Sequence, residues 1–130
     1  MANIKKEIAA GWNLYHRWRS QKTFSPALKK QVLFTRQGWE HITGRDDKKR
    51  TAGDVYRRLK LLPHARGIIS KMPLVQNKRR KGNNTFYALE AMIDIKDGDK
   101  VSERKIRVVL KEDKVGAVRF FSIMDKKQKK

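Results

Sequence analysis

The first part of the chain carries large apolar residues at helical spacing. Five of them fall on one stripe of a helix over residues 3–19, with most basic residues off it: Ile4, Ile8, Trp12, Tyr15 and Trp18. This pattern predicts an amphipathic helix. The stripe either packs on the domain or is a surface for RNA bases, a membrane or a partner. Pro26 and the polar run before it are expected to end this unit.

Shorter elements are predicted in the middle of the chain. Residues 31–36 form a short strand, and residues 38–42 form a helical turn that leads into a hydrophilic segment. Residues 54–62 place apolar side chains at helical spacing, and Pro63 is expected to end this helix.

The second half of the chain changes to a period of two, which is typical of half-buried strands. One face of the stretch 85–95 is apolar: Tyr87, Leu89, Ala91, Ile93 and Ile95. After the strong hairpin signal Asp97-Gly98, residues 103–111 alternate again, and a third strand is expected over residues 118–124. Three consecutive strands of this kind predict an antiparallel meander.

Helices followed by a meander predict an α+β fold, with N-terminal helices packed on a C-terminal antiparallel sheet. The expected organisation is an amphipathic helix and linker in residues 1–25 and an α+β domain in residues 26–124. Residues 125–130 are expected to be a disordered lysine tail.

The net charge of the chain limits the classes of partner that it is expected to bind. Lysine and arginine number 33 against 13 acidic residues, which gives a net charge of +20. Such an excess favours RNA or DNA, an anionic membrane or an acidic protein as partner. No apolar stretch reaches the length of a membrane span, and the N-terminus lacks the apolar run of a secretion signal. The absence of cysteine excludes disulfides, thiol catalysis and cysteine-ligated zinc, and fits action in the cytoplasm.

Metal and nucleotide sites find little support in the sequence. The three histidines share no ligand spacing, and no glycine-rich phosphate loop is present. We therefore expect no metal and no cofactor.

The remaining polar groups suit RNA cleavage without a metal, in which the 2′-hydroxyl of RNA is the nucleophile and the protein supplies a base, an acid and cations. His41, beside Arg45, is the best candidate for proton transfer; the alternative is a solvated surface histidine. Glu90 is a candidate carboxylate base, or else it pairs with Lys105 or Arg107 across the sheet.

Ser122 stands at an apolar position of its strand and is either a tolerated core group or a donor at a cleft. Residues 78–81, followed by Gly-Asn-Asn, suggest a mobile basic loop for backbone contacts. Charges on strands are often a solvated outer face, which is the alternative to a phosphate-binding role. The candidate RNA-binding cations are Arg45, Arg57, Lys78, Arg79, Arg80, Lys105 and Arg119.

Several stretches together resemble the barnase, EndoU, colicin tRNase and RelE superfamily of ribonucleases, and above all its small variants in phage polyvalent proteins and bacterial polymorphic toxins. The resemblance covers about residues 31–124 and excludes the first helix. The stretches that carry it are 32–35 (Val-Leu-Phe-Thr), 39–42 (Trp-Glu-His-Ile), 54–63, the strand of Tyr87, 105–110 (Lys-Ile-Arg-Val-Val-Leu) and 120–123 (Phe-Phe-Ser-Ile).

This resemblance implies metal-free cleavage to a 2′,3′-cyclic phosphate in a cleft on the sheet. His41, Arg107 and Ser122 match the positions that family members commonly use; no Glu-Arg-His order like that of barnase is present, so the general base stays open. The resemblance also implies a tRNA or rRNA substrate and an acidic immunity or antitoxin protein. The site of action would be the bacterial cytoplasm, with delivery from a larger secreted toxin as one route.

Two other functions remain open. Charge and aromatic residues would suffice for a non-catalytic RNA-binding or ribosome-associated protein, because charge alone does not distinguish binding from cleavage. A membrane-active basic helix at residues 3–19 is the third.

Overall fold

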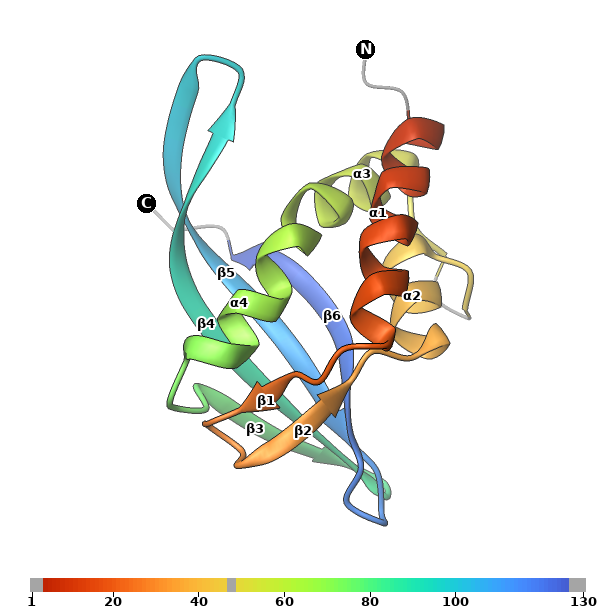
Figure 1. Cartoon of the computed structure of the whole chain (residues 1–130), viewed down its shortest axis with the longest axis vertical. Helices are drawn as coiled ribbons and strands as arrows, with labels where there is room; N and C mark the ends of the chain where they lie inside the picture. Colours follow the sequence, from red (N-terminus) through yellow and green to blue (C-terminus); the bar gives the residue numbers. More distant parts are fainter. Residues whose placement is uncertain (1–3, 47–48, 127–130) are drawn as a thin grey trace.

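The computed structural model describes residues 4–46 and 49–126 and has an α+β fold (Figure 1). The elements follow in the order α1 (Ile4–Arg19), β1 (Phe24–Ser25), β2 (Lys30–Leu33), α2 (Arg36–Thr43), α3 (Ala52–Leu61), the 3-10 helix η1 (Leu62–His64), α4 (Ala65–Lys71), β3 (Asn77–Lys81), β4 (Asn84–Asp97), β5 (Lys100–Glu112) and β6 (Val118–Lys126).

The strands form one mixed sheet in the order β1-β2-β6-β5-β4-β3. All neighbours are antiparallel except β2 and β6, which run parallel. The expected meander of β4, β5 and β6 is present, but the sheet is larger, because β1, β2 and β3 add to its two sides. The end of the β4–β5 hairpin extends past the other strands (Figure 1).

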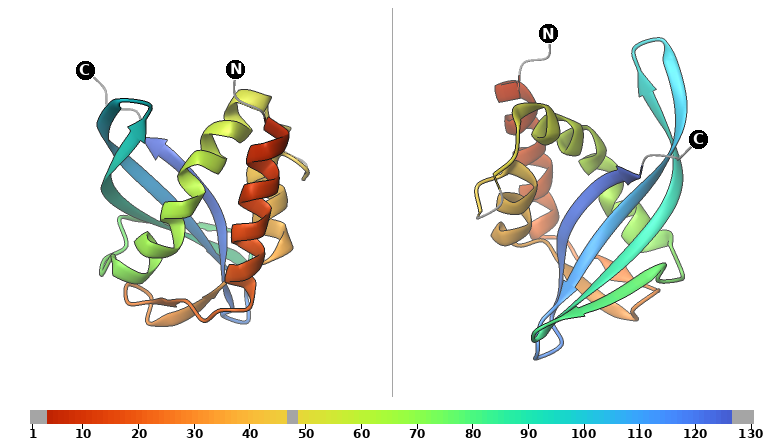
Figure 2. Two further views of the ribbon diagram at one scale, coloured as in Figure 1. Left: turned by 45° about the horizontal axis from the view of Figure 1, so that its top comes forward. Right: turned by 180° about the vertical axis from the view of Figure 1, so that it is seen from behind.

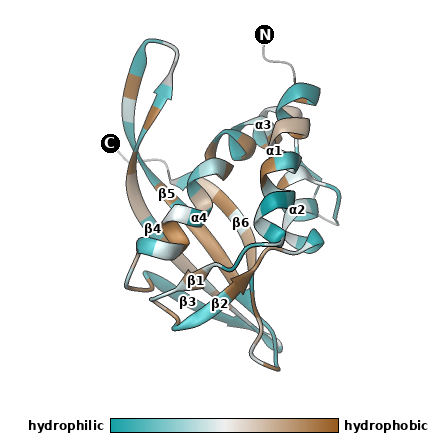
Figure 3. Ribbon diagram, viewed as in Figure 1, coloured by the Kyte–Doolittle hydropathy of each residue, from teal (hydrophilic) through white to brown (hydrophobic). Residues whose placement is uncertain are grey.

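The core lies between one face of the sheet and the helices α1, α3 and α4 (Figure 2). The predicted alternation is confirmed, since Leu89, Ile106, Val108 and Leu110 are fully buried. Hydrophobic residues accordingly concentrate in β4, β5 and β6 behind the helices (Figure 3).

Helix α1 packs on this core through the end of its apolar stripe. Tyr15 and Trp18 are buried, and the Tyr15 hydroxyl donates a hydrogen bond to the carbonyl oxygen of Thr35. Ile4, Ile8 and Trp12 are partly buried against the same core. The interpretation that the stripe packs on the domain is thus the one that the structure supports. No helix of the described part of the chain is both long and apolar enough to cross a bilayer.

Helix α2 lies directly against β6. A Cβ atom on Gly38 would fall 2.5 Å from the carbonyl oxygen of Phe120 and 2.7 Å from the Tyr15 hydroxyl. Only glycine allows this close approach, which fixes the position of His41 one turn later in the helix.

The structure corrects the predictions for residues 78–81 and for Pro63. Residues 78–81, expected to form a mobile loop, belong to strand β3, which pairs with β4 across a turn that contains Gly82 at φ 61°. All five residues of this edge strand are exposed, so its sequence shows no apolar alternation. Pro63 does not end the helical region. It lies in the first turn of η1, where its missing N–H costs nothing, and the chain continues directly into α4.

A β-bulge in β6 corrects the predicted side-chain parity of that strand. Leu110 pairs with Phe120 and Val109 with Ser122, so Phe121 is an extra residue. Beyond the bulge, Ile123 takes the core position opposite Val108. Met124 pairs with Arg107, a residue outside the core. Strand β6 continues to Lys126, so residues 125–126 of the expected tail are in a strand, and 127–130 lie outside the described residues.

Candidate functional site

A hollow of about 460 Å³ opens on the face of the sheet that the helices α1, α3 and α4 leave uncovered. We call it the sheet groove. Its β5 members, Arg107 and Val109, alternate with the buried core residues of that strand. The groove is lined by His41, Asn77, Arg79, Lys81, Phe86, Tyr87, Ala88, Arg107, Val109, Phe121 and Met124.

The groove combines cations with aromatic rings. Arg79, Lys81 and Arg107 line it, and none of the described residues that line it is a carboxylate. Phe86 and Phe121 pack edge to face with ring centroids 5.2 Å apart. Cations that follow a phosphate backbone, beside rings on which bases stack, are the elements of single-stranded nucleic-acid binding. The chemistry of the groove therefore suits an unpaired RNA strand.

His41 reaches the groove from the last turn of α2. Its ring stacks on Phe121 with a centroid distance of 4.0 Å. Its Nδ1 lies 2.8 Å from Oδ2 of Asp46, and its Nε2 lies 3.0 Å from Nη2 of Arg50. A guanidinium has only donors, so Nε2 accepts and Nδ1 carries the proton that it donates to Asp46. This geometry requires the neutral imidazole.

The electrostatic surroundings of His41 agree with that assignment. Burial lowers the pKa of His41, and the positive charge of Arg50 acts in the same direction. Together they outweigh the hydrogen bond to Asp46, which raises the pKa. The imidazole is therefore neutral near pH 7 and has its basic lone pair on Nε2.

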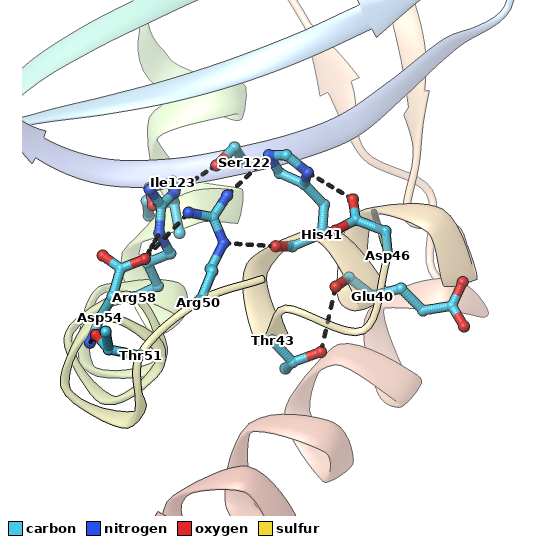
Figure 4. A network of polar contacts seen from close by, with 10 residues as sticks. All are labelled: Glu40, His41, Thr43, Asp46, Arg50, Thr51, Asp54, Arg58, Ser122 and Ile123. Atoms are coloured by element: carbon cyan, nitrogen blue, oxygen red, sulfur yellow. Dashed lines mark hydrogen bonds and ion pairs between the residues drawn. The ribbon is translucent and has the colours of Figure 1, made fainter. Parts of the chain in front are cut away.

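Behind His41 a chain of polar contacts leads to β6 (Figure 4). We call it the polar network; it consists of Asp46, His41, Arg50, Asp54, Arg58 and Ser122. Arg50 and Arg58 both contact Oδ2 of Asp54, at 3.0 and 3.2 Å. Arg58 also donates from Nη1 to Oγ of Ser122, at 2.7 Å.

The network holds two arginines in place away from water. The side chain of Arg50 is 5% exposed, and its Nε donates to the His41 carbonyl oxygen at 2.7 Å. Burial acts to raise the pKa of Asp54, but the two guanidiniums outweigh it, and the pKa falls below its ordinary value. Asp54 is therefore ionised at neutral pH. The arginine on either side fixes its orientation.

The structure brings together two of the four predicted catalytic residues, since His41 and Arg107 line the same groove. Glu90 does not line it; its Oε2 lies 2.7 Å from Arg107, so the alternative of cross-strand pairing describes its position. Ser122 is 1% exposed and bonds to Arg58, which is the alternative of a core polar group.

The predicted RNA-binding cations are more dispersed. Arg79 lines the sheet groove, whereas Arg45 lines a separate hollow between α1 and α2, and Arg57 lines a third beside α3. Arg119 forms an ion pair with Asp113 at 3.0 Å. The remaining three are Lys78, whose Nζ lies over the Tyr87 ring, exposed Arg80 on β3, and half-buried Lys105 on β5.

Sequence reasoning missed Asp46, Arg50, Asp54 and Arg58 as members of the site. One signal was available, because residues 50, 54 and 58 follow one another at a spacing of four and alternate in charge. On a helix this spacing brings side chains such as those of Asp54 and Arg58 together on one face, and Arg50 lies directly before the N-cap of α3.

The described residues contain no group of three or more His, Cys, Asp or Glu side chains placed to hold a metal ion. A comparison of the chain with known protein families, curated proteins and solved structures finds no match.

Proposed function

We propose that this protein is a metal-independent endoribonuclease whose substrate strand lies in the sheet groove. The observation that carries this proposal is the meeting of neutral His41 with Arg79, Lys81 and Arg107 around one hollow with aromatic walls. Cations alone bind RNA, but a neutral imidazole beside them adds a group that accepts and returns a proton at neutral pH.

In the proposed reaction the RNA 2′-hydroxyl gives its proton to the general base, Nε2 of His41 or the Glu90 carboxylate, and attacks the adjacent phosphorus. The bond from phosphorus to the 5′-oxygen breaks, and the protonated base returns the proton to this oxygen. The products carry a 2′,3′-cyclic phosphate and a 5′-hydroxyl. Arg107 stabilises the charge that develops on the phosphorane oxygens, with Arg79 and Lys81 holding the flanking phosphates.

Proton transfer by His41 requires its Nε2 to exchange Arg50 for an atom of the substrate. A phosphate oxygen is charged, so it is a better acceptor for the guanidinium than a neutral ring nitrogen. In this proposal Nη2 of Arg50 leaves Nε2 for a phosphate oxygen of the bound RNA, while its Nε and Nη1 keep their contacts with the His41 carbonyl oxygen and Asp54. Glu90, held by Arg107, is the other candidate for the general base.

The proposal includes a tRNA or rRNA substrate, action in the bacterial cytoplasm and an acidic immunity or antitoxin protein. A free ribonuclease would degrade the RNA of the cell that makes it. A net charge of +20 would make association with an acidic inhibitor fast and sensitive to salt.

The test is incubation of the purified protein with total tRNA or rRNA in EDTA, followed by mapping of fragment ends. Discrete fragments with 2′,3′-cyclic phosphate ends are expected. His41→Ala should lower the rate by a factor of about 100 to 10,000 and leave RNA affinity nearly unchanged. His64→Ala is the matched control, because His64 lines a different hollow with Ala91 and Ile93.

One observation favours a second function, a non-catalytic RNA-binding protein. Both candidate bases are engaged, Nε2 of His41 by Arg50 and Oε2 of Glu90 by Arg107. The same assay separates the two functions, because a binder retards the RNA and leaves it intact. Full cleavage by folded His41→Ala would instead remove His41 from the mechanism and leave Glu90 as the base.

A further inference from the structure

A second hollow, of about 700 Å³, lies between α1 and α2. We call it the α1–α2 groove. It is lined by Lys5, Ile8, Ala9, Trp12, Arg19, Arg36, Trp39, Glu40 and Arg45. Neither the polar network nor the proposed reaction uses it.

The α1–α2 groove is strongly cationic. Among the described residues that line it, the one carboxylate is Glu40, which pairs with Arg36 at 3.3 Å between Oε2 and Nε. Lys5, Arg19 and Arg45 add further positive charges to its lining, and all three side chains are exposed. Within the described residues, neither Arg19 nor Arg45 forms an ion pair. The groove is therefore complementary to a polyanion.

The groove also contains a positioned aromatic ring. Trp12 is only partly buried, whereas Trp39 behind it is 5% exposed. The two rings meet edge to face, with centroids 5.3 Å apart and an interplanar angle of 61°. Packing on Trp39 thus fixes the indole of Trp12 before a ligand arrives. A planar ring beside several cations favours a nucleotide over an acidic peptide, because a base stacks on the ring while its phosphate meets the cations.

Helix α2 separates the two grooves. Trp39 and Glu40 line the α1–α2 groove, and the next residue, His41, lines the sheet groove. A helix with its side chains is about 10–12 Å across, so a single strand can pass from one groove to the other.

We propose that the α1–α2 groove binds a segment of the substrate RNA outside the cleaved bond, with one base stacked on Trp12 and its phosphates on Lys5, Arg19 and Arg45. This inference rests on the proposed function, in which the sheet groove holds the cleaved part of the same strand. The groove then sets the minimum length of unpaired RNA that binds well.

The experiment uses 2′-O-methyl oligouridylates of increasing length, because they keep the RNA backbone but have no free 2′-hydroxyl to attack phosphorus. Affinity of the full chain is measured by fluorescence anisotropy at fixed salt. For the wild-type protein it should rise in a step once the oligomer reaches both grooves. Trp12→Leu should remove the step, with a loss of about 5- to 150-fold for long oligomers and no change for the shortest.

Arg45→Gln is the second variant, since this exposed side chain tests the groove without removing any core contact of Trp12. It should also weaken binding of the long oligomers alone. The matched controls are Phe24→Leu and Lys60→Gln, which change an exposed aromatic residue and an exposed cation outside both grooves.

The same length dependence in the wild-type protein and in both groove variants would overturn the inference, and an acidic protein would then be the occupant to test. The proposed function is tested independently of this inference: it would be refuted if tRNA stayed intact in the cleavage assay. The oligomers cannot be cleaved, so a length step that depends on Trp12 and Arg45 would still assign the α1–α2 groove to RNA.

Discussion

Replacing Ser122 by alanine tests whether its hydroxyl serves the polar network or the chemistry. Oγ accepts a hydrogen bond of 2.7 Å from the Arg58 guanidinium, at a residue that is 1% exposed. Ser122→Ala leaves the charged Arg58 donor without this partner at a side chain that is only 12% exposed. Arg58 keeps its contacts with Asp54 and the Ile123 carbonyl oxygen, so the network should persist in a weakened form.

The magnitude follows from the charge of the donor. A hydrogen bond to a charged group contributes about 1.5–3 kcal/mol, so the free energy of unfolding should fall by about that amount. For a chain of this size the melting temperature should drop by roughly 5–15 °C. The rate of RNA cleavage per folded molecule should stay close to that of the wild-type protein, because Ser122 does not line the sheet groove.

Ser102→Ala is the matched control. Ser102 also accepts from an arginine, Nε of Arg104 at 3.2 Å, but on the exposed part of β5. It should change the free energy of unfolding by less than about 0.5 kcal/mol. Equal denaturation curves for the two variants would refute the role of Ser122 in the network. A loss of cleavage at unchanged stability would place its hydroxyl in the reaction.

Three more predictions concern salt, pH and packing. If about six to ten phosphates are contacted, RNA affinity should fall a thousandfold or more between about 50 and 200 mM salt, as measured by filter binding. An affinity that does not change with salt would show that the positive charge serves another partner than RNA. Folding lowers the pKa of His41, so the folded state favours the neutral imidazole. Its contribution to the free energy of unfolding is therefore fully present above the ordinary pKa of 6.5 and is lost as the pH falls through the lowered pKa. Denaturant titrations from acid to neutral pH should show this loss for the wild-type protein and not for His41→Ala. Gly38→Ala should destabilise the fold by about 1–3 kcal/mol or more, because its Cβ would meet the Phe120 carbonyl oxygen, whereas Gly53→Ala on α3 should stabilise it by about 0.4–1 kcal/mol in the same thermal melts. A wild-type melting temperature for Gly38→Ala would contradict the close contact of α2 and β6.

The predictable part of the fold is the part where burial alternates. β4 and β5 follow from their sequences because one face of each is in the core. β3 was missed because all of its residues are exposed and the strand is held by backbone hydrogen bonds. Such a strand has no alternation of apolar and polar side chains from which it could be predicted. The alternation of buried and outward side chains in β6 shifts by one residue at Phe121. A β-bulge within a run of apolar residues has no sequence pattern that predicts its position.

The candidate site was partly predictable because strand alternation and local polarity can be followed along the sequence. Arg107 could be placed on the outer face of β5 from parity, and His41 from its polar segment after a strand. Their meeting could not be predicted, because it depends on the parallel pairing of β2 with β6. The position of Ser122 beside Arg58 likewise joins residues 64 apart in the chain.

The central place of β6 has a consequence for folding during synthesis. β2 and α2 are made early, but the strand that they pack on begins only at Val118. Contacts of such sequence separation form slowly, since a long loop must close first. On an emerging chain, His41 therefore has no Phe121 to stack on and the groove does not exist. If the protein cleaves RNA, its activity is withheld from the nascent polypeptide until this last strand leaves the ribosome.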